Sequence, residues 1–300
     1  MPLVDRLNSV TGLIVGATLG AVSGNVFGAS LGLLLGSGAA SKQKPDKSPV
    51  FKASNHSSGH MIQLEGRNPV QEALKAGTVT LIRVEKGKQR DPKIQEILDA
   101  AAAKKVPVEP VTRQKLDRIS ETGHHQGIIA VAEPSPTWSL EKVLKETGRE
   151  ACILLLDRVQ DPHNLGAILR TSDAAGVDGV VIPKRGSADL GATVHRVSMG
   201  GSLHVPVWRQ SLYTAIKTLK DDGFRIVGVD AFGDTPYWGV NLTGAVAFVL
   251  GGEDRGINPT LLDKCDALVR IPMMGRIPSL NVSVATAIVL YERLRQQENG

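Results

Sequence analysis

The second half of this 300-residue chain alternates between near-continuous apolar segments and segments with helical spacing. The apolar segments include CILLL at residues 152–156 and AVAFVL at residues 245–250. Strands that are apolar on both faces and interleaved with helices are typical of a parallel sheet covered by helices on both sides. We therefore predict a parallel α/β domain over residues 151–300. Ligands should bind at the carboxyl ends of its strands.

A smaller α/β unit is predicted over residues 61–135, with helices near residues 68–77 and 91–105. A proline-containing linker with one helix follows at residues 136–150. Residues 1–60 carry five basic and two acidic side chains, residues 61–150 carry 15 and 13, and residues 151–300 carry 15 and 15. The excess positive charge thus lies in the first half. Nucleic-acid contacts are expected there, or in local patches of the neutral second half.

The N-terminal 60 residues are unlike the rest of the chain. Glycine occupies every fourth position from residue 12 to residue 36, within a stretch that has no charge from Leu7 to Ser41. That length suits one transmembrane helix, and a glycine stripe lets helices pack closely in lipid. The lysines that follow would then place the later domains in the cytoplasm. A secretory signal and a leader added during cloning stay open, because SSGHM at residues 57–61 looks like a cloning junction.

Polar residues in three loops that follow apolar strands are the candidates for chemistry. They are Asn164, Arg170, Glu253, Ser279 and Asn281. Helix capping is the alternative for Asn164, Ser279 and Asn281. Arg170 is predicted to share an apolar helix face, where its charge would need an anionic partner.

Other kinds of site have little support in the sequence. No phosphate-binding loop is present, and the adjacent histidines 124 and 125 are poorly spaced for a shared ion, so no metal is expected. The two cysteines lie far apart in the chain. They favour a reduced, intracellular protein.

The segments DPHNLGAILRTSDAAG, LGGEDRGI and IPMMGRIPSLNVSVATA resemble, in order and spacing, the three motifs of the SpoU/TrmH family of ribose methyltransferases, which belongs to the SPOUT class. Residues 62–133 resemble the L30e-like substrate-binding domain of the RlmB-like branch of that family. The resemblance covers about residues 62–297. It implies a homodimer whose catalytic domain contains a deep trefoil knot that binds S-adenosylmethionine.

The resemblance also assigns residues. Arg170 matches the catalytic arginine, supported by Asn164, Glu253, Ser279 and Asn281. The cofactor contacts are expected at Gly251, Gly252, Ile271, Met273 and Leu280. Basic residues of the smaller unit are candidates for RNA contacts, namely Arg67, Lys104, Lys105 and Arg113.

The implied reaction is 2′-O-methylation of a guanosine in 23S-type large-subunit rRNA. A tRNA ribose and a non-catalytic ribosome-assembly factor of the same fold are the alternatives. Leu203 stands where relatives often have an acidic residue, and Pro278 is unusual directly before SLNVS in the third motif, which leaves the substrate open. The remaining class of function is a membrane protein organised by the glycine stripe, to which the enzyme domains are attached.

Overall fold

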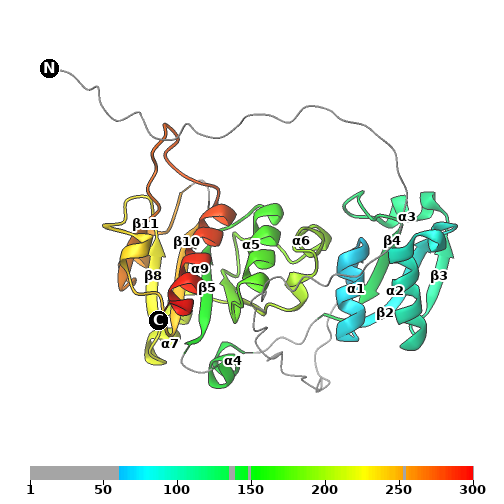
Figure 1. The fold of residues 1–300 in the computed structure, drawn as a ribbon, viewed down its shortest axis with the longest axis horizontal. Helices are drawn as coiled ribbons and strands as arrows, with labels where there is room; N and C mark the ends of the chain where they lie inside the picture. Colours follow the sequence, from blue (N-terminus) through cyan, green and yellow to red (C-terminus); the bar gives the residue numbers. More distant parts are fainter. Residues whose placement is uncertain (1–60, 135–138, 148–149, 253–254, 300) are drawn as a thin grey trace, which may run out of the picture. The chain divides into compact units, whose positions relative to one another are not determined.

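The structure is a computed structural model that describes residues 61–134, 139–147, 150–252 and 255–299. The glycine stripe at residues 12–36 and Glu253 lie outside the described residues, as does part of the predicted linker. The described residues form two sheets with helices packed against them (Figure 1). Within them, no helix combines the length and the apolar character that crossing a membrane requires.

The first sheet has the strand order β1-β4-β2-β3. β4 runs antiparallel to β1 and to β2, and β3 runs parallel to β2. The strand β1 was not predicted, because its four residues are too few to show a period. The elements are β1 (Ile62–Glu65), α1 (Arg67–Ala76), β2 (Val79–Glu85), α2 (Pro92–Ala103), β3 (Val108–Val111), α3 (Arg113–Ile119) and β4 (Ile128–Ala132).

Both faces of this sheet are covered. Ile128 and Ala130 of β4 point into a core that includes residues of α1 and α2. Ile129, between them, packs with Leu116 of α3 on the opposite face. Successive side chains of a strand alternate between its two faces, which explains the division.

The second sheet has the strand order β7-β6-β5-β10-β8-β11-β9, and every neighbouring pair is parallel. The prediction of a parallel α/β domain is therefore confirmed. Its strands are β5 (Cys152–Asp157), β6 (Gly179–Ile182), β7 (Val207–Arg209), β8 (Arg225–Val229), β9 (Thr235–Pro236), β10 (Val246–Gly251) and β11 (Ala267–Arg270). Its helices are α4 (Leu140–Thr147), α5 (Pro162–Ala174), α6 (Ala192–Val197), α7 (Leu212–Asp221), α8 (Pro259–Leu262) and α9 (Val282–Glu298).

The two faces of this sheet have separate cores. Leu154 and Leu156 of β5 lie in the core that includes buried residues of α5 and α9, two helices that pack against each other (Figure 1). Ile153 and Leu155 lie in the core built with α4, α7 and α8. The strand is apolar from Cys152 to Leu156 because both of its faces are covered.

Three local details of the structure were not predicted. The strand β7 begins only at Val207, because residues 201–203 form a 3-10 turn. The last helix begins at Val282 rather than at Ser279, since Asn281 caps it. The two-residue strand β9 had no signal in the sequence. Cys152 is buried, and burial raises the pKa of its thiol to about 12.

Candidate functional site

The loops of the three motifs leave neighbouring strands at one edge of the second sheet. Gly251 at the end of β10 lies in register with Asp157 at the end of β5. On the other side of β10, Leu250 is in register with Val229 of β8, which in turn pairs with Val269 of β11. Because all four strands are parallel, residues 157–161, 251–258 and 271–281 start from the same edge. This is where open α/β sheets bind ligands.

A buried carboxylate joins the first two of these loops. Asp157 accepts a hydrogen bond from the backbone N–H of Asn258 at 2.8 Å and pairs with Arg158, whose Nε lies 3.2 Å away. Its carbonyl oxygen accepts from the N–H of Gly252 at 2.8 Å. Arg158 adopts φ +60°, a conformation that side chains other than glycine rarely adopt. Our sequence reasoning missed both Asp157 and Arg158, although the first charge after a fully apolar strand was a usable signal.

The glycines of the second motif allow two stretches of this chain to touch. A Cβ placed on Gly251 would lie 2.0 Å from the carbonyl carbon of Gly256, and one on Gly252 would lie 2.3 Å from the carbonyl oxygen of Arg158. Gly251 therefore lets the β10 loop fold back against Gly256, and Gly252 lets the same loop pack on the β5 loop. Gly251 and Gly252 are nonetheless half-exposed at the strand ends.

Two asparagines link the first motif to the third. Asn281 caps α9, because its Oδ1 accepts from the N–H of Ser283 at 2.8 Å. Its Nδ2 donates to Oδ1 of Asn164 at 2.9 Å. Asn164 is buried within α5, whose cap is Asp161. Capping therefore accounts for part of the role of Asn281 and does not account for Asn164.

Arg170 does not share the apolar face of α5. Leu165, Ile168 and Leu169 are buried, whereas Arg170 is exposed. At about 100° per residue, position 170 lies roughly 200° around the helix from position 168, so the expectation of an apolar setting was wrong. Arg170 also lies about 9 Å along the helix axis from Asn164, given a rise of about 1.5 Å per residue. The structure does not bring its backbone to the asparagine pair.

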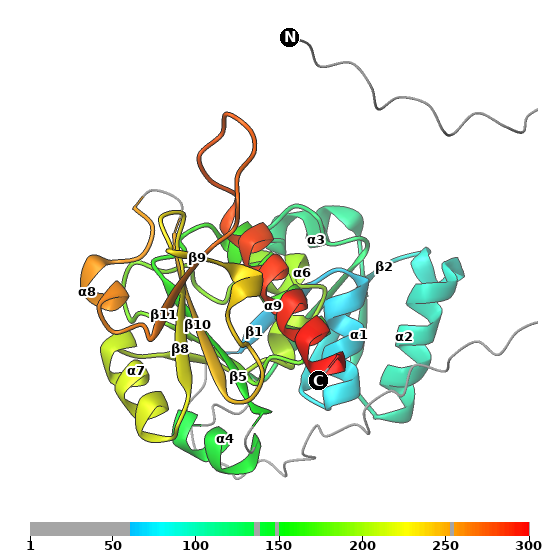
Figure 2. The same cartoon turned by 60° about the vertical axis from the view of Figure 1, so that its left-hand side comes forward.

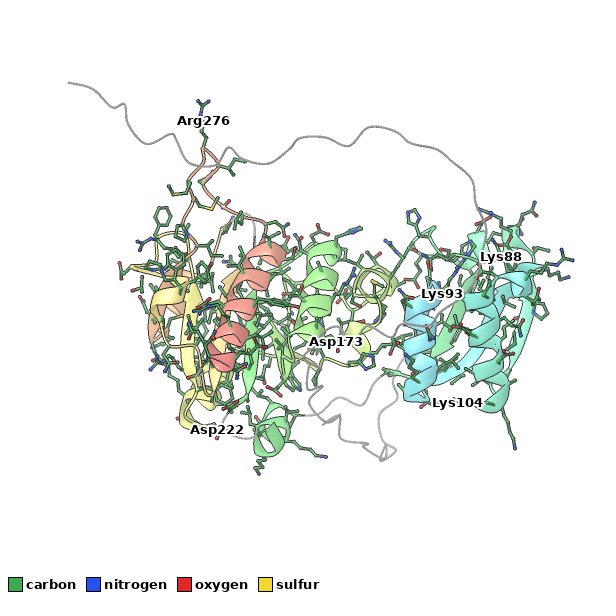
Figure 3. All side chains as sticks on the ribbon, in the orientation of Figure 1. Lys88, Lys93, Lys104, Asp173, Asp222 and Arg276 are labelled. Carbon is green, nitrogen blue, oxygen red and sulfur yellow. The ribbon has the colours of Figure 1, made fainter. Side chains whose placement is uncertain are left out.

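The third loop leaves β11 half-buried and then becomes exposed. Ile271 and Met273 are half-buried, and Ile271 packs against the core beneath α5 and α9. Residues 274–281, which include Ser279 and Leu280, are exposed. This dark orange segment stands out from the sheet in Figure 2, and Arg276 lies at its outer end in Figure 3. Ser279 has no capping role on α9.

The four basic candidates in the first sheet fall into two places. Arg67 and Arg113 line one recess together with Lys88, Lys93 and His124. Lys104 and Lys105 follow the other end of α2, about 17 Å from its start at about 1.5 Å per residue. Figure 3 shows the separation between Lys88 or Lys93 and Lys104.

The wall of the recess is held in place by two buried polar groups. Glu65 accepts hydrogen bonds from Ser120 Oγ at 2.8 Å and from the N–H of Glu121 at 2.6 Å. Burial alone would raise the pKa of Glu65, but hydrogen bonds from residues 120–122 hold it below its ordinary value. Nδ1 of His125 accepts from the N–H of Gly127 at 3.0 Å, so its Nε2 donates to Asp117, 2.9 Å away. His125 is thus structural.

Comparison with known proteins places this arrangement in one family. Residues 151–291 match the model of the SpoU rRNA Methylase family, and residues 63–138 match the model described as RNA 2'-O ribose methyltransferase substrate binding. The chain is 39% identical over 239 residues to a putative TrmH family tRNA/rRNA methyltransferase of Staphylococcus aureus, spanning 78% of this chain and 96% of that one. The chain belongs to the SpoU/TrmH family of RNA methyltransferases.

Solved structures agree with the family. This SpoU/TrmH methyltransferase superimposes with a TM-score of 0.71 on an RNA 2'-O ribose methyltransferase that is 31% identical, covering 80% of this chain and 90% of that one. The TM-score is 0.68, at 25% identity, for the SpoU methyltransferase AviRb of Streptomyces viridochromogenes in complex with AdoMet, covering 80% and 91% of the two chains. The AdoMet-bound rRNA methyltransferase of Sinorhizobium meliloti gives 0.64 at 26% identity, covering 78% and 87%.

Proposed function

We propose that this methyltransferase methylates the 2′-hydroxyl of a ribose in RNA, and that its target is a guanosine of 23S-type large-subunit rRNA. The Asn164–Asn281 hydrogen bond carries the proposal, because it joins the first and third motifs where the strands of the second sheet end. Relatives are described as tRNA/rRNA methyltransferases, so a tRNA ribose is the second target to test. An RNA substrate suits a cytoplasmic location for residues 61–300.

S-adenosylmethionine is the cofactor of this enzyme, as the family and its AdoMet-bound structures support. The residues at the strand ends suit it: Ile271 and Met273 offer half-buried apolar side chains, and Gly251 and Gly252 leave the backbone accessible beside them. Leu280 lies at the end of the same loop. Bound there, the cofactor supplies a methyl group already activated by its sulfonium. The family resemblance predicts that the segment carrying these cofactor contacts is knotted.

Arg170 would act on the RNA. An arginine stays protonated in ordinary settings, so we assign its guanidinium to the phosphate next to the target ribose. This contact would orient the 2′-hydroxyl and increase its nucleophilicity while its proton passes to solvent water. A strict base role for Arg170 is the family's alternative. Asn164, Ser279 and Asn281 would position the ribose from the sheet edge, together with Glu253.

A second copy of the chain would complete the site. Apolar side chains are exposed on the third loop and on α9, among them Met274, Ile277, Val284 and Tyr291. Val284 and Tyr291 are seven residues apart and share a helix face, which suits a helical interface. Arg170 lies about 9 Å along α5 from Asn164. A homodimer could therefore bring the arginine of one protomer to the asparagine pair of the other.

The recess of the first sheet would bind RNA. Arg67, Lys88, Lys93 and Arg113 gather basic groups on one side of this unit. Phosphate contacts of this kind give affinity without reading sequence. Lys104 is a weaker candidate, because its Nζ already donates to the carbonyl of Lys75 at 3.0 Å.

Transfer of a labelled methyl group tests the function. Purified protein would be incubated with methyl-labelled S-adenosylmethionine and with unmodified rRNA or tRNA transcripts, and 2′-O-methylation would be mapped by resistance to alkaline cleavage. We expect one modified guanosine in rRNA and loss of turnover by at least 100-fold in Arg170→Ala. Arg225→Ala, an exposed arginine at the opposite edge of the sheet, is the control. Near-normal turnover in Arg170→Ala would refute its role, and modification of tRNA alone would change the substrate.

A further inference from the structure

Phe232 is an aromatic side chain that the proposed site does not use. It follows β8, and 93% of its surface is exposed, more than for any other large aromatic among the described residues. The chain is poor in aromatic residues, at 4% of its length. The unit built on the first sheet has no Phe, Tyr or Trp between residues 61 and 134. Among the described residues, stacking of a Phe, Tyr or Trp ring on an RNA base must therefore come from the unit built on the second sheet.

The backbone around Phe232 is held firmly. Its N–H donates to Oδ1 of Asp230 at 2.9 Å, and the N–H of Asp230 donates to the carbonyl of Val269 on β11 at 2.9 Å. Nη1 of Arg270 donates to the carbonyl of Gly233 at 2.9 Å. A ring presented on a fixed turn loses little conformational freedom when it binds a flat partner.

The position of Phe232 is beside the reaction site. Because β8 lies between β10 and β11, the turn after β8 emerges between the loops of the second and third motifs. A Cβ placed on Gly256, in the second-motif loop, would lie 3.9 Å from Oδ2 of Asp230. The ring therefore stands at the same sheet edge as the proposed cofactor site.

Two exposed cations flank the other side of that edge. Lys184 and Arg185 follow β6 directly and are exposed. Their loop packs on the first motif, since the N–H of Ala188 donates to the carbonyl of Val159 at 2.9 Å. β6 and β8 are separated by three strand spacings, or roughly 14 Å at about 4.8 Å each. That span matches about four stacked nucleotides at roughly 3.4 Å per step.

We propose that Phe232 stacks on a base of the substrate RNA next to the target nucleotide, while Lys184 and Arg185 bind phosphates of the same strand on the far side of the reaction site. This rests on the proposed RNA methylation. Positive charge with an aromatic ring is how proteins hold single strands without reading sequence. A ligand pocket encloses most of a small cofactor, whereas this ring is open to solvent, which favours the RNA over the adenine of the cofactor.

Ring substitutions of Phe232 test the stacking. Phe232→Leu keeps an apolar side chain and removes the ring, and Phe232→Trp keeps a ring. We expect Phe232→Leu to weaken binding of a target-site RNA oligonucleotide about 5- to 150-fold, the equivalent of one stacked base, and Phe232→Trp to restore it. KM for RNA should rise more than kcat falls. Affinity for S-adenosylmethionine, measured by calorimetry, should stay unchanged.

The cation arm is tested by salt dependence. Lys184→Ala with Arg185→Ala should lower the slope of log affinity against log salt by about 1.4, at roughly 0.7 for each phosphate that the variant no longer neutralises. Lys217→Ala, an exposed lysine on α7, is the control and should leave the slope unchanged. An unchanged slope in the double variant would overturn this part.

Other outcomes separate the alternatives. Equal RNA affinity of wild type and Phe232→Leu would overturn the stacking. So would a loss of cofactor affinity or a shift from dimer to monomer, because the ring would then contact the cofactor or a second copy. If the wild-type protein methylates no RNA, the proposed function itself fails. Measuring RNA binding by the same variants separates that failure from a failure of the stacking proposal.

Discussion

Replacing the buried carboxylate of Asp157 should destabilise the protein more than replacing an exposed one. The Asp157 side chain is 7% exposed and pairs with Arg158, and it also accepts the N–H of Asn258. Hydrogen bonds to a charged group contribute about 1.5–3 kcal/mol, and a buried donor left unpaired costs about 1–3 kcal/mol. Asp157→Ala should therefore lower the free energy of unfolding by about 3 kcal/mol. For a protein of this size that is a fall in Tm of about 6–12 °C.

A matched aspartate provides the control for this prediction. Asp189 also pairs with an arginine, Arg209, at 2.8 Å, but its side chain is 95% exposed. Exposed pairs contribute about 0–1 kcal/mol, so Asp189→Ala should change Tm by about 4 °C or less. Thermal unfolding followed by circular dichroism, with calorimetry of S-adenosylmethionine binding, measures both variants. Equal Tm values for the two would refute the idea that Asp157 holds the β5 and β10 loops together.

Three further outcomes follow from the structure. Gly252→Ala should weaken cofactor binding and lower the free energy of unfolding, because its Cβ would meet the carbonyl oxygen of Arg158 at 2.3 Å. Gly191→Ala, which has open space around it, is the control, and its free energy of unfolding by denaturant titration should be within about 0.5 kcal/mol of wild type. Burial lowers the pKa of His195 to about 4, below its ordinary 6.5. Between these pH values the unfolded chain binds a proton that the folded chain does not, so the free energy of unfolding should fall by up to about 3 kcal/mol as the pH drops from 6.5 to 4. His195→Gln should remove this pH dependence. Since burial raises the pKa of Cys152 to about 12, iodoacetamide at pH 8 should label it at least 100-fold more slowly in the native protein than in the denatured chain, and similar rates would contradict its burial.

The parallel sheet could be predicted because its signal is local. The central strands β5 and β10 are apolar on both faces, and that pattern alone implies cover on both sides. The location of the motif loops followed, since parallel strands end at one edge. The strand order did not follow. Nothing near β10 in the sequence indicates that it inserts between β5 and β8, because pairing partners are chosen by packing over the whole domain.

The contacts that assemble the site could not be read from the sequence for a similar reason. Asn164 and Asn281 are 117 residues apart, and the carboxylate of Asp157 reaches an N–H 101 residues away. The error at Arg170 was of a different kind. At about 100° per residue, Ile168 and Leu169 lie within about 60° of Leu165 around the helix, whereas position 170 lies about 140° away, beyond the apolar face. Counting the period would have corrected that expectation.

One part of the site is held together by hydrogen bonds within the chain, and the other part is exposed and lacks partners among the residues that the structure describes. Asp157 accepts the N–H of Asn258, and Asn281 donates to Asn164, both within the described residues. Among those residues, Arg170 is exposed and has no ion pair, and Val284 and Tyr291 are uncovered apolar side chains. Variants of the first part should therefore change Tm and cofactor affinity together. Variants of the second should leave Tm nearly unchanged and change turnover, because their partners are the RNA and the second protomer. If Arg170→Ala lowered Tm as much as Asp157→Ala, this division between a self-supporting edge and an open reaction surface would be wrong.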